Sequence, residues 1–132
     1  MSRKPRLTPT EWELMETIWS LGSAVSVRDV LERAYPRGEK AYTTVQTTMN
    51  ILEKKGLLRR RKTGLVNFYT PTRSREEMVR AEVSSLIARV FAGSIPAVAS
   101  SLLSLDSLSL EEIAQIRKLL RKKERELREE SS

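Results

Sequence analysis

The chain has 132 residues, of which 39% are hydrophobic and 31% are charged, which suits one compact domain or a small domain with an appendage. It contains no cysteine and no histidine, which excludes disulfides, thiol redox chemistry, thiolate or imidazole metal sites and histidine acid–base catalysis. It also lacks Gly-rich phosphate loops and the Gly-x-Ser-x-Gly and Ser-x-x-Lys patterns. We therefore expect no enzyme, no catalytic residues, no metal and no cofactor.

The net charge of +7 arises entirely in the N-terminal half of the chain. Residues 1–73 hold 14 Lys and Arg against 7 Asp and Glu, whereas residues 74–132 hold ten of each kind. A basic half joined to a neutral half favours a polyanion-binding module attached to a region with another task, although charge alone also fits a merely soluble basic protein. No apolar run reaches the ~18 residues of a membrane span. The basic first six residues are not followed by the apolar stretch that a signal peptide has. We therefore expect a cytoplasmic protein without membrane insertion.

The first helix is predicted to begin at Thr8, which forms a capping-box pattern with Glu11, and to end at Gly22. Trp12 and Trp19 share one stripe of this helix with other apolar residues. We therefore predict that the two tryptophans belong to the core and do not stack on bases.

Two further helices are predicted before residue 56. One begins after the N-cap Ser26 and ends at the turn cluster of residues 35–38, and the next covers roughly Tyr42 to Lys55. The apolar face of this third helix is predicted to meet the core through Val45, Met49 and Leu52. Its opposite face is small, polar and without acids, and it carries Thr43, Thr44, Gln46, Thr47, Asn50 and Lys54.

Residues 57–71 contain two β-prone runs around a Thr63-Gly64 turn, and this pattern predicts a hairpin that ends at Pro71. The part of the hairpin near its tip is basic. Its cations are Arg59, Arg60, Arg61 and Lys62.

The second half is predicted to be helical. Ser74 begins a helix that runs as far as Gly93, a short helix follows Pro96, and Ser109 caps the last helix. The end of the last helix, residues 121–130, is nearly all charged and is predicted to fray. The predicted fold is mainly α with a small β-hairpin wing, divided into a DNA-binding domain of residues 1–73 and a helical dimerisation domain of residues 74–132.

The order helix, helix, turn, helix, basic hairpin indicates a winged helix-turn-helix, whose second motif helix enters the major groove of DNA. Thr, Gln and Asn side chains can approach base edges, and Arg and Lys can contact phosphates. The basic N-terminal residues Arg3, Lys4 and Arg6 are predicted to add an arm. The predicted DNA-binding residues are Arg6, Tyr42, Thr43, Thr44, Gln46, Thr47, Asn50, Lys54, Arg59, Arg60, Arg61 and Lys62.

Other interpretations remain open. The polar helix face also fits an ordinary solvated surface, and the basic run also fits an edge strand protected against aggregation. A winged helix that binds protein or RNA is the main alternative, although an aromatic content of 5% offers few platforms for stacking single-stranded bases. A helical scaffold acting through the second half is a further alternative, but that half carries no excess of charge.

Several blocks of residues together resemble the penicillinase-repressor (BlaI/MecI) family. They are residues 7–15 (LTPTEWELM) with Ile18-Trp19, residues 42–47 (YTTVQT), residues 52–57 (LEKKGL), residues 68–71 (FYTP) and, more weakly, residues 108–113 (LSLEEI). The order and spacing of these blocks also fit, and the resemblance covers nearly the whole chain.

This resemblance implies a homodimeric winged-helix repressor that binds a palindromic double-stranded DNA operator. It implies that the positions of Thr43, Thr44, Gln46 and Thr47 face the DNA, and that the helices after Pro71 form the dimer interface. The residues predicted for that interface are Met78, Val83, Leu86, Ile87, Val90, Phe91, Leu102, Leu103, Ile113, Ile116 and Leu120.

The resemblance also implies a partner that relieves repression. In the family, a membrane sensor-protease or another signalling protease triggers cleavage in the C-terminal region, at an Asn-Phe bond in the best-known members. The matching pair in this chain is Ser101-Leu102, which departs from that rule. A copper-responsive branch uses C-terminal cysteines, which this chain lacks.

Overall fold

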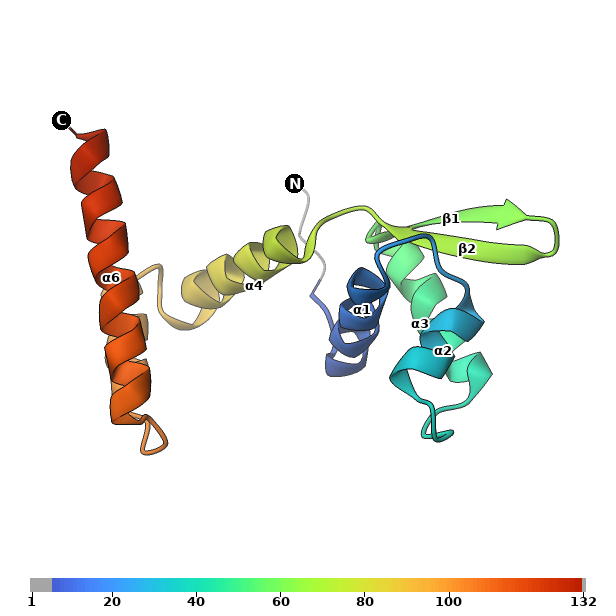
Figure 1. Cartoon of the computed structure of the whole chain (residues 1–132), viewed down its shortest axis with the longest axis horizontal. Coiled ribbons are helices and arrows are strands. Elements are labelled where there is room, and N and C mark those ends of the chain that lie inside the picture. Colours follow the sequence, from blue (N-terminus) through green and yellow to red (C-terminus); the bar gives the residue numbers. More distant parts are fainter. Residues whose placement is uncertain (1–5, 132) are drawn as a thin grey trace. The chain divides into compact units, whose positions relative to one another are not determined.

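The computed structural model describes residues 6–131, and Figure 1 shows the order of its elements. They are α1 (Pro9–Leu21), α2 (Val27–Ala34), α3 (Tyr42–Lys54), β1 (Leu58–Thr63), β2 (Val66–Pro71), α4 (Arg75–Val90), α5 (Ile95–Leu103) and α6 (Leu110–Glu130). This architecture confirms the predicted fold class of a helical chain with one small hairpin. The chain divides into two compact units, the first ending at Ser84 and the second beginning at Ser85, so the division falls inside α4.

The helix starts follow the predicted capping residues. The Thr8 hydroxyl accepts a hydrogen bond from the Glu11 backbone N–H at 3.1 Å, and the Glu11 carboxylate accepts one from the Thr8 N–H at 2.7 Å. The same reciprocal arrangement begins α2 at Ser26 and α6 at Ser109. These bonds satisfy backbone donors that have no partner within the helix, which is why the sequence pattern locates the starts so well.

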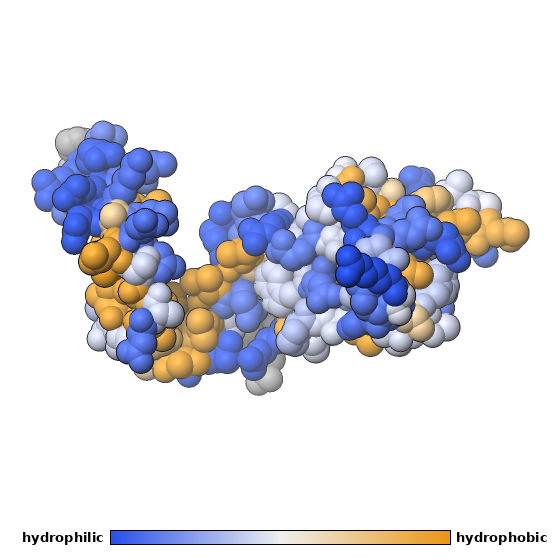
Figure 2. Space-filling model, turned by 60° about the horizontal axis from the view of Figure 1, so that its bottom comes forward, coloured by the Kyte–Doolittle hydropathy of each residue, from blue (hydrophilic) through white to orange (hydrophobic). Residues whose placement is uncertain are grey.

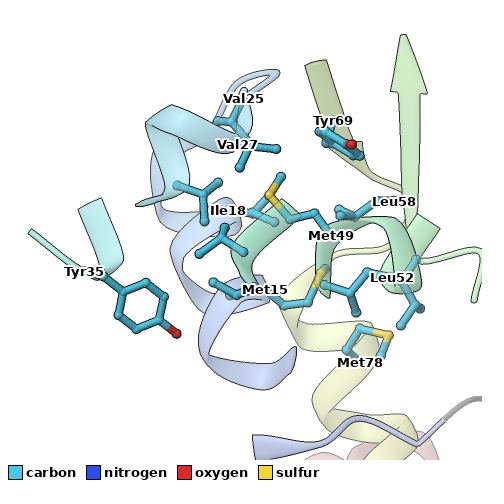
Figure 3. Packing of buried hydrophobic residues seen from close by; sticks show 14 residues of the cluster. Met15, Ile18, Val25, Val27, Tyr35, Met49, Leu52, Leu58, Tyr69 and Met78 are labelled. Carbon is cyan, nitrogen blue, oxygen red and sulfur yellow. The ribbon is translucent and has the colours of Figure 1, made fainter. Parts of the chain in front are cut away.

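The core of the first unit lies where α1, α2 and α3 pack together at the base of the hairpin (Figure 3). The three predicted core residues of α3 are at most 1% exposed. The buried hydrophobic residues are Leu14, Met15, Ile18, Val25, Val27, Val30, Tyr35, Val45, Met49, Leu52, Leu57, Leu58, Tyr69 and Met78.

The two tryptophans lie at the margin of this core. Trp12 and Trp19 are partly buried, pack against the core cluster, and have ring centroids 6.1 Å apart. The Trp19 indole N–H also donates to the Arg73 carbonyl at 3.0 Å, which ties α1 to the segment before α4. The predicted packing role is confirmed, and the hydrogen bond adds a structural role for the exposed edge of the ring.

The predicted hairpin is confirmed. β1 and β2 are antiparallel, and Thr63 pairs with Val66 around a two-residue loop of Gly64 and Leu65. Gly64 has a φ of +65°, a conformation that glycine adopts without steric cost. A third segment, not predicted from the sequence, joins the hairpin: Val25 forms a bridge to Tyr69 through backbone hydrogen bonds of 3.0 and 2.7 Å.

The second unit contains short α5 and long α6. α5 begins after Ser94, whose hydroxyl accepts from the Ala97 N–H at 3.1 Å. An apolar groove of about 230 Å³ lies between the two helices, lined by Ala99, Leu102, Leu103, Ile113, Ile116, Arg117 and Leu120. Among residues 85–131, no side chain is buried, so this unit has no closed core of its own.

The charged end of the last helix, which the sequence predicts to fray, is helical in the structure, and α6 continues to Glu130. Charged side chains spaced four residues apart stabilise such a helix even where it has no packing partner. Arg128 lies 3.4 Å from Glu124 in this way.

No single helix in the described part of the chain has the length and apolar character of a membrane span. α4 and α5 pass that test only as a pair bent by 91°, which is weak support for a span.

Candidate nucleic-acid interface

The polar face of α3 is open to solvent, as predicted. Thr43, Thr44, Gln46 and Thr47 are all exposed, while Val45 between them is 1% exposed and points into the core. The buried stripe fixes the rotation of the helix, so the hydroxyl and amide groups form an outward ridge. These groups can donate and accept hydrogen bonds at base edges, and the threonine methyls can contact the methyl group of thymine.

The N-terminal end of α3 adds positive electrostatic potential to this ridge. Its N-cap, Ala41, makes no side-chain hydrogen bond, and its first turn carries no acid. Tyr42 in that turn is 40% exposed, and the Arg28 guanidinium lies 5.6 Å from the centre of its ring. Arg28 comes from α2 and was missed in the sequence analysis, because only the packing of α2 on α3 brings it near the predicted site.

Asn50 connects the polar face to the hairpin. Its side-chain oxygen accepts a hydrogen bond from the Tyr69 hydroxyl at 2.7 Å, and the Tyr69 side chain is buried. Burial raises the pKa of Tyr69, although nearby Arg60 opposes that rise, so the hydroxyl stays protonated and can donate at neutral pH. The Asn50 oxygen therefore holds the wing in place, a role that differs from the predicted base contact.

The four consecutive cations of β1 divide between the two faces of the hairpin. Arg60 pairs across the strands with buried Tyr69, and its Nε lies 3.7 Å from a carboxylate oxygen of Glu53 in α3. Arg59 and Arg61 alternate with it and lie on the opposite face, where both are exposed. Arg60 is thus partly neutralised within the protein, whereas its two neighbours are better placed to contact phosphates.

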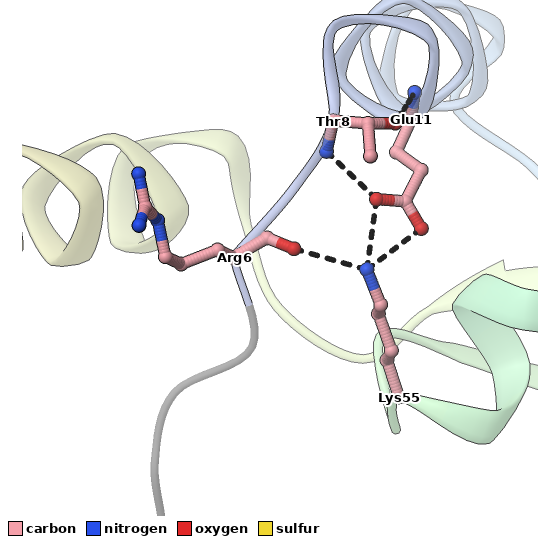
Figure 4. Close-up of polar contacts among 4 residues, drawn as sticks. All are labelled: Arg6, Thr8, Glu11 and Lys55. Atoms are coloured by element: carbon pink, nitrogen blue, oxygen red, sulfur yellow. Dashed lines mark hydrogen bonds and ion pairs between the residues drawn. The ribbon is translucent and has the colours of Figure 1, made fainter.

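A partly buried ion pair anchors the start of the described chain to the end of α3 (Figure 4). The Lys55 ammonium lies 2.8 Å from both carboxylate oxygens of Glu11 and donates to the Arg6 carbonyl at 2.9 Å. Burial alone would raise the pKa of Glu11, but hydrogen bonds from Lys55 and Thr8 outweigh it and hold that pKa below its usual range. The pair was missed because its partners are 44 positions apart in the sequence.

Arg6, the one described residue of the predicted N-terminal arm, has its backbone far from Thr43. The Arg6 backbone is held beside Lys55, 12 residues along from Thr43, which is about 18 Å at 1.5 Å per helical residue. The Arg6 side chain is exposed and points away from Lys55 (Figure 4). Lys54 is also exposed at this end of α3, while Arg3 and Lys4 lie outside the described residues.

Most of the residues predicted for the dimer interface are exposed or partly exposed within the single chain. Their exposure reaches 59% at Val90, 60% at Leu103 and 64% at Leu120. Met78 is the exception and a correction: it is 5% exposed and belongs to the core of the first unit, so it is not available to a partner.

The predicted cleavage pair, Ser101 and Leu102, lies in the last turn of α5, and both residues are exposed. Their backbone is helical, so a protease could bind it in an extended form only after this turn opens.

The chain is similar to known proteins at the level of family, of individual relatives and of solved structures. The family model described as "Penicillinase repressor" matches residues 7–122. A penicillinase repressor from Bacillus licheniformis is 28% identical, with 91% of this chain and 93% of that protein covered. A transcriptional regulator BlaI from Mycobacterium tuberculosis is 32% identical over 67% of this chain and 64% of its own length. The solution structure of the DNA-binding domain of the repressor BlaI superposes with a TM-score of 0.50 at 30% identity, covering 58% of this chain and 93% of that domain.

Proposed function

Because this chain belongs to the penicillinase repressor family, we propose that it is a transcriptional repressor whose α3 binds the major groove of duplex DNA. The observation that carries this proposal is the exposed ridge of Thr43, Thr44, Gln46 and Thr47 beside a basic hairpin. Membership of a repressor family also confirms the expectation that the chain is not an enzyme. A repressor acts where the DNA is, so we place it in the cytoplasm of a bacterial cell.

The operator-bound form in this proposal is a homodimer joined through the second unit. The main support is that no described side chain after Ser84 is buried, although α5 and α6 carry an apolar groove. A helical unit of this size gains a core most simply by pairing with a second copy of itself. Such a dimer would place two α3 helices about one DNA turn apart, or a multiple of it, on a palindromic operator.

Relief of repression is proposed to occur by proteolysis in the second unit, triggered by a sensor-protease or another signalling protease. A cut near Ser101 and Leu102 would separate α6 from α5 and remove half of the groove. Each half-site would then be held by one weakly bound monomer, because the gain from linking two binding modules would be lost. Limited proteolysis with mass spectrometry, together with immunoblots of induced cells, tests this step: full-length protein in cells whose target genes are active would contradict it.

The central test of the function is a gel-shift experiment on the full chain. Duplex fragments selected by the protein from genomic DNA should bind much more tightly than either of their separated strands. Equal or tighter binding of single strands or RNA would instead support the alternative of an RNA-binding winged helix.

A further inference from the structure

The loop at the end of the β1–β2 hairpin is apolar, although the strand that leads to it is basic. Leu65, the second loop residue, is 95% exposed, and Val66 beside it is 45% exposed. Figure 2 shows hydrophobic surface at the free end of the hairpin. Two-residue hairpin loops usually carry Gly, Asn, Asp or Ser, and an exposed leucine contributes nothing to the packing of the unit. The Leu65 side chain is therefore free to contact a partner outside the chain.

The surroundings of this leucine match a polyanion. The hairpin, from Leu58 to Pro71, contains no acidic residue. Arg61 and Lys62 lie within four residues of Leu65, are exposed, and point to opposite faces of the ribbon. An apolar tip between two cations is complementary to a DNA groove, in which charged phosphate walls enclose less polar sugars and bases.

The attachment of the hairpin determines which groove the tip can reach. The Tyr69–Asn50 hydrogen bond and the Arg60–Glu53 ion pair fasten its base to the C-terminal half of α3. Six residues of β1 span about 20 Å at ~3.3 Å per residue, so the tip extends well beyond the helix. With α3 in the major groove, the tip would pass the flanking phosphates toward the neighbouring minor groove. That groove is about 6 Å wide, too narrow for a two-stranded ribbon but wide enough for a side chain.

We propose that Leu65 enters the minor groove of the bound DNA and presses on the base pairs at its floor as an apolar wedge. This inference rests on the proposed function. The 2-amino group of guanine projects from that floor, whereas A·T pairs have no group there. Leu65 therefore gives the protein a preference for A·T-like steps beside the sequence that α3 contacts.

Inosine provides a test that isolates the minor groove, because it lacks the 2-amino group but presents the same major-groove edge as guanine. The dissociation constants of the full-length protein are measured for two synthetic duplexes of equal length, one alternating G·C and one alternating I·C. The wild-type protein should bind the I·C duplex about fivefold more tightly, and Leu65→Ser should lose most of that preference.

Two control variants separate the wedge from other effects. Lys62→Ala should weaken binding to both duplexes equally and leave their ratio unchanged, since it removes a phosphate contact. Ser20→Ala changes an exposed side chain of α1, outside the α3 ridge, the hairpin and the second unit, and should leave both dissociation constants unchanged. An unchanged circular dichroism spectrum would show that the Leu65→Ser variant is folded.

The outcomes distinguish the wedge from the function on which it rests. A wild-type protein that binds neither these duplexes nor the fragments it selects from genomic DNA contradicts DNA binding itself. A wild-type protein that binds both duplexes equally, or a Leu65→Ser variant that keeps the full I·C preference, overturns the wedge alone. The second of these results would point to a protein surface as the partner of the hairpin tip.

Discussion

Individual side chains of the proposed interface divide into those that determine sequence preference and those that supply charge. Thr44 and Gln46 are exposed on the polar ridge of α3, so replacing either with Ala should cost roughly 1–3 kcal/mol on the preferred sequence and little on random DNA. Arg61→Ala should instead weaken binding to all sequences about equally. Binding profiles over a library of randomised duplexes measure this difference. Identical base preferences for the three variants would contradict the assignment.

Arg61 is a better position than Arg60 for testing the contribution of charge alone. Arg60 is paired with Glu53 and packs with buried Tyr69, so its loss would disturb the wing as well as remove a charge. Arg61 lies on the opposite face, where no such pairing is found among the described residues. The alternation of strand residues predicts that neighbouring cations point in opposite directions, but only the observed register shows which of them faces α3.

The Glu11–Lys55 pair should make the stability of the first unit depend on acid pH. The folded-state pKa of Glu11 is lowered, so the pair stabilises the fold above the unfolded-state pKa of about 4.3 and loses this effect as pH falls through the folded-state value. Glu11→Gln should lower the free energy of unfolding by roughly 1–3 kcal/mol at neutral pH. Denaturant titrations across pH should show the two proteins converging below about pH 4. A difference in the free energy of unfolding that is independent of pH would mean that the ionised Glu11 carboxylate does not stabilise the fold.

At the scale of elements, the first compact unit extends to Ser84, beyond the limit at Arg73 that the sequence predicts for the DNA-binding domain. Met78 is buried in the core of the first unit, and Arg75 at the start of α4 lies 2.7 Å from Glu16 of α1. The first part of α4 therefore stabilises the winged helix. The division proposed between residues 73 and 74 separates DNA binding from dimerisation. The compact units of the structure instead divide between residues 84 and 85.

Two truncated chains test this boundary. A chain that ends at Ser84 should be a stable monomer, while a chain that ends at Arg73 should lose about 2–5 kcal/mol of stability, since it lacks the buried Met78 side chain. Sedimentation gives the oligomeric state and denaturant titration gives the stability. A dimeric shorter chain would contradict dimerisation through the second unit, and equal stability of the two chains would contradict the role of Met78.

The elements themselves were largely predictable from the sequence, and the reason is local. Caps such as Thr8 and Ser109, the apolar stripe of α3 and the glycine of the hairpin loop all act within a few residues of their position. The bridge between Val25 and Tyr69 was not predictable, because it joins segments that only the packing of the helices brings together. The helical state of residues 121–130 was less predictable, because it depends on charge pairs four residues apart and not on an apolar stripe.

For the whole molecule, the candidate site could be predicted as a set of residues but not as an arrangement. Charge distribution and helical periodicity pointed to the α3 ridge and the basic wing. The internal partners of Asn50, Arg60 and Lys55 depend on tertiary contacts, and these contacts divide the predicted list into scaffold residues and residues exposed for DNA.

That division sets the expected salt dependence of the repressor–DNA complex. With Arg60 partly neutralised by Glu53, we expect about three phosphate contacts per protomer, from Arg59, Arg61 and Lys62. Each neutralised phosphate releases condensed counterions, so a dimer should show a slope of log K against log salt of about −5. Arg61→Ala removes two contacts from the dimer and should reduce the magnitude of the slope by about 2, whereas Gln46→Ala should leave it unchanged. Equilibrium titrations of selected duplex fragments at several salt concentrations measure both effects. A wild-type slope near zero would contradict phosphate binding by the wing, and a slope near −2.5 would instead indicate that one protomer binds alone.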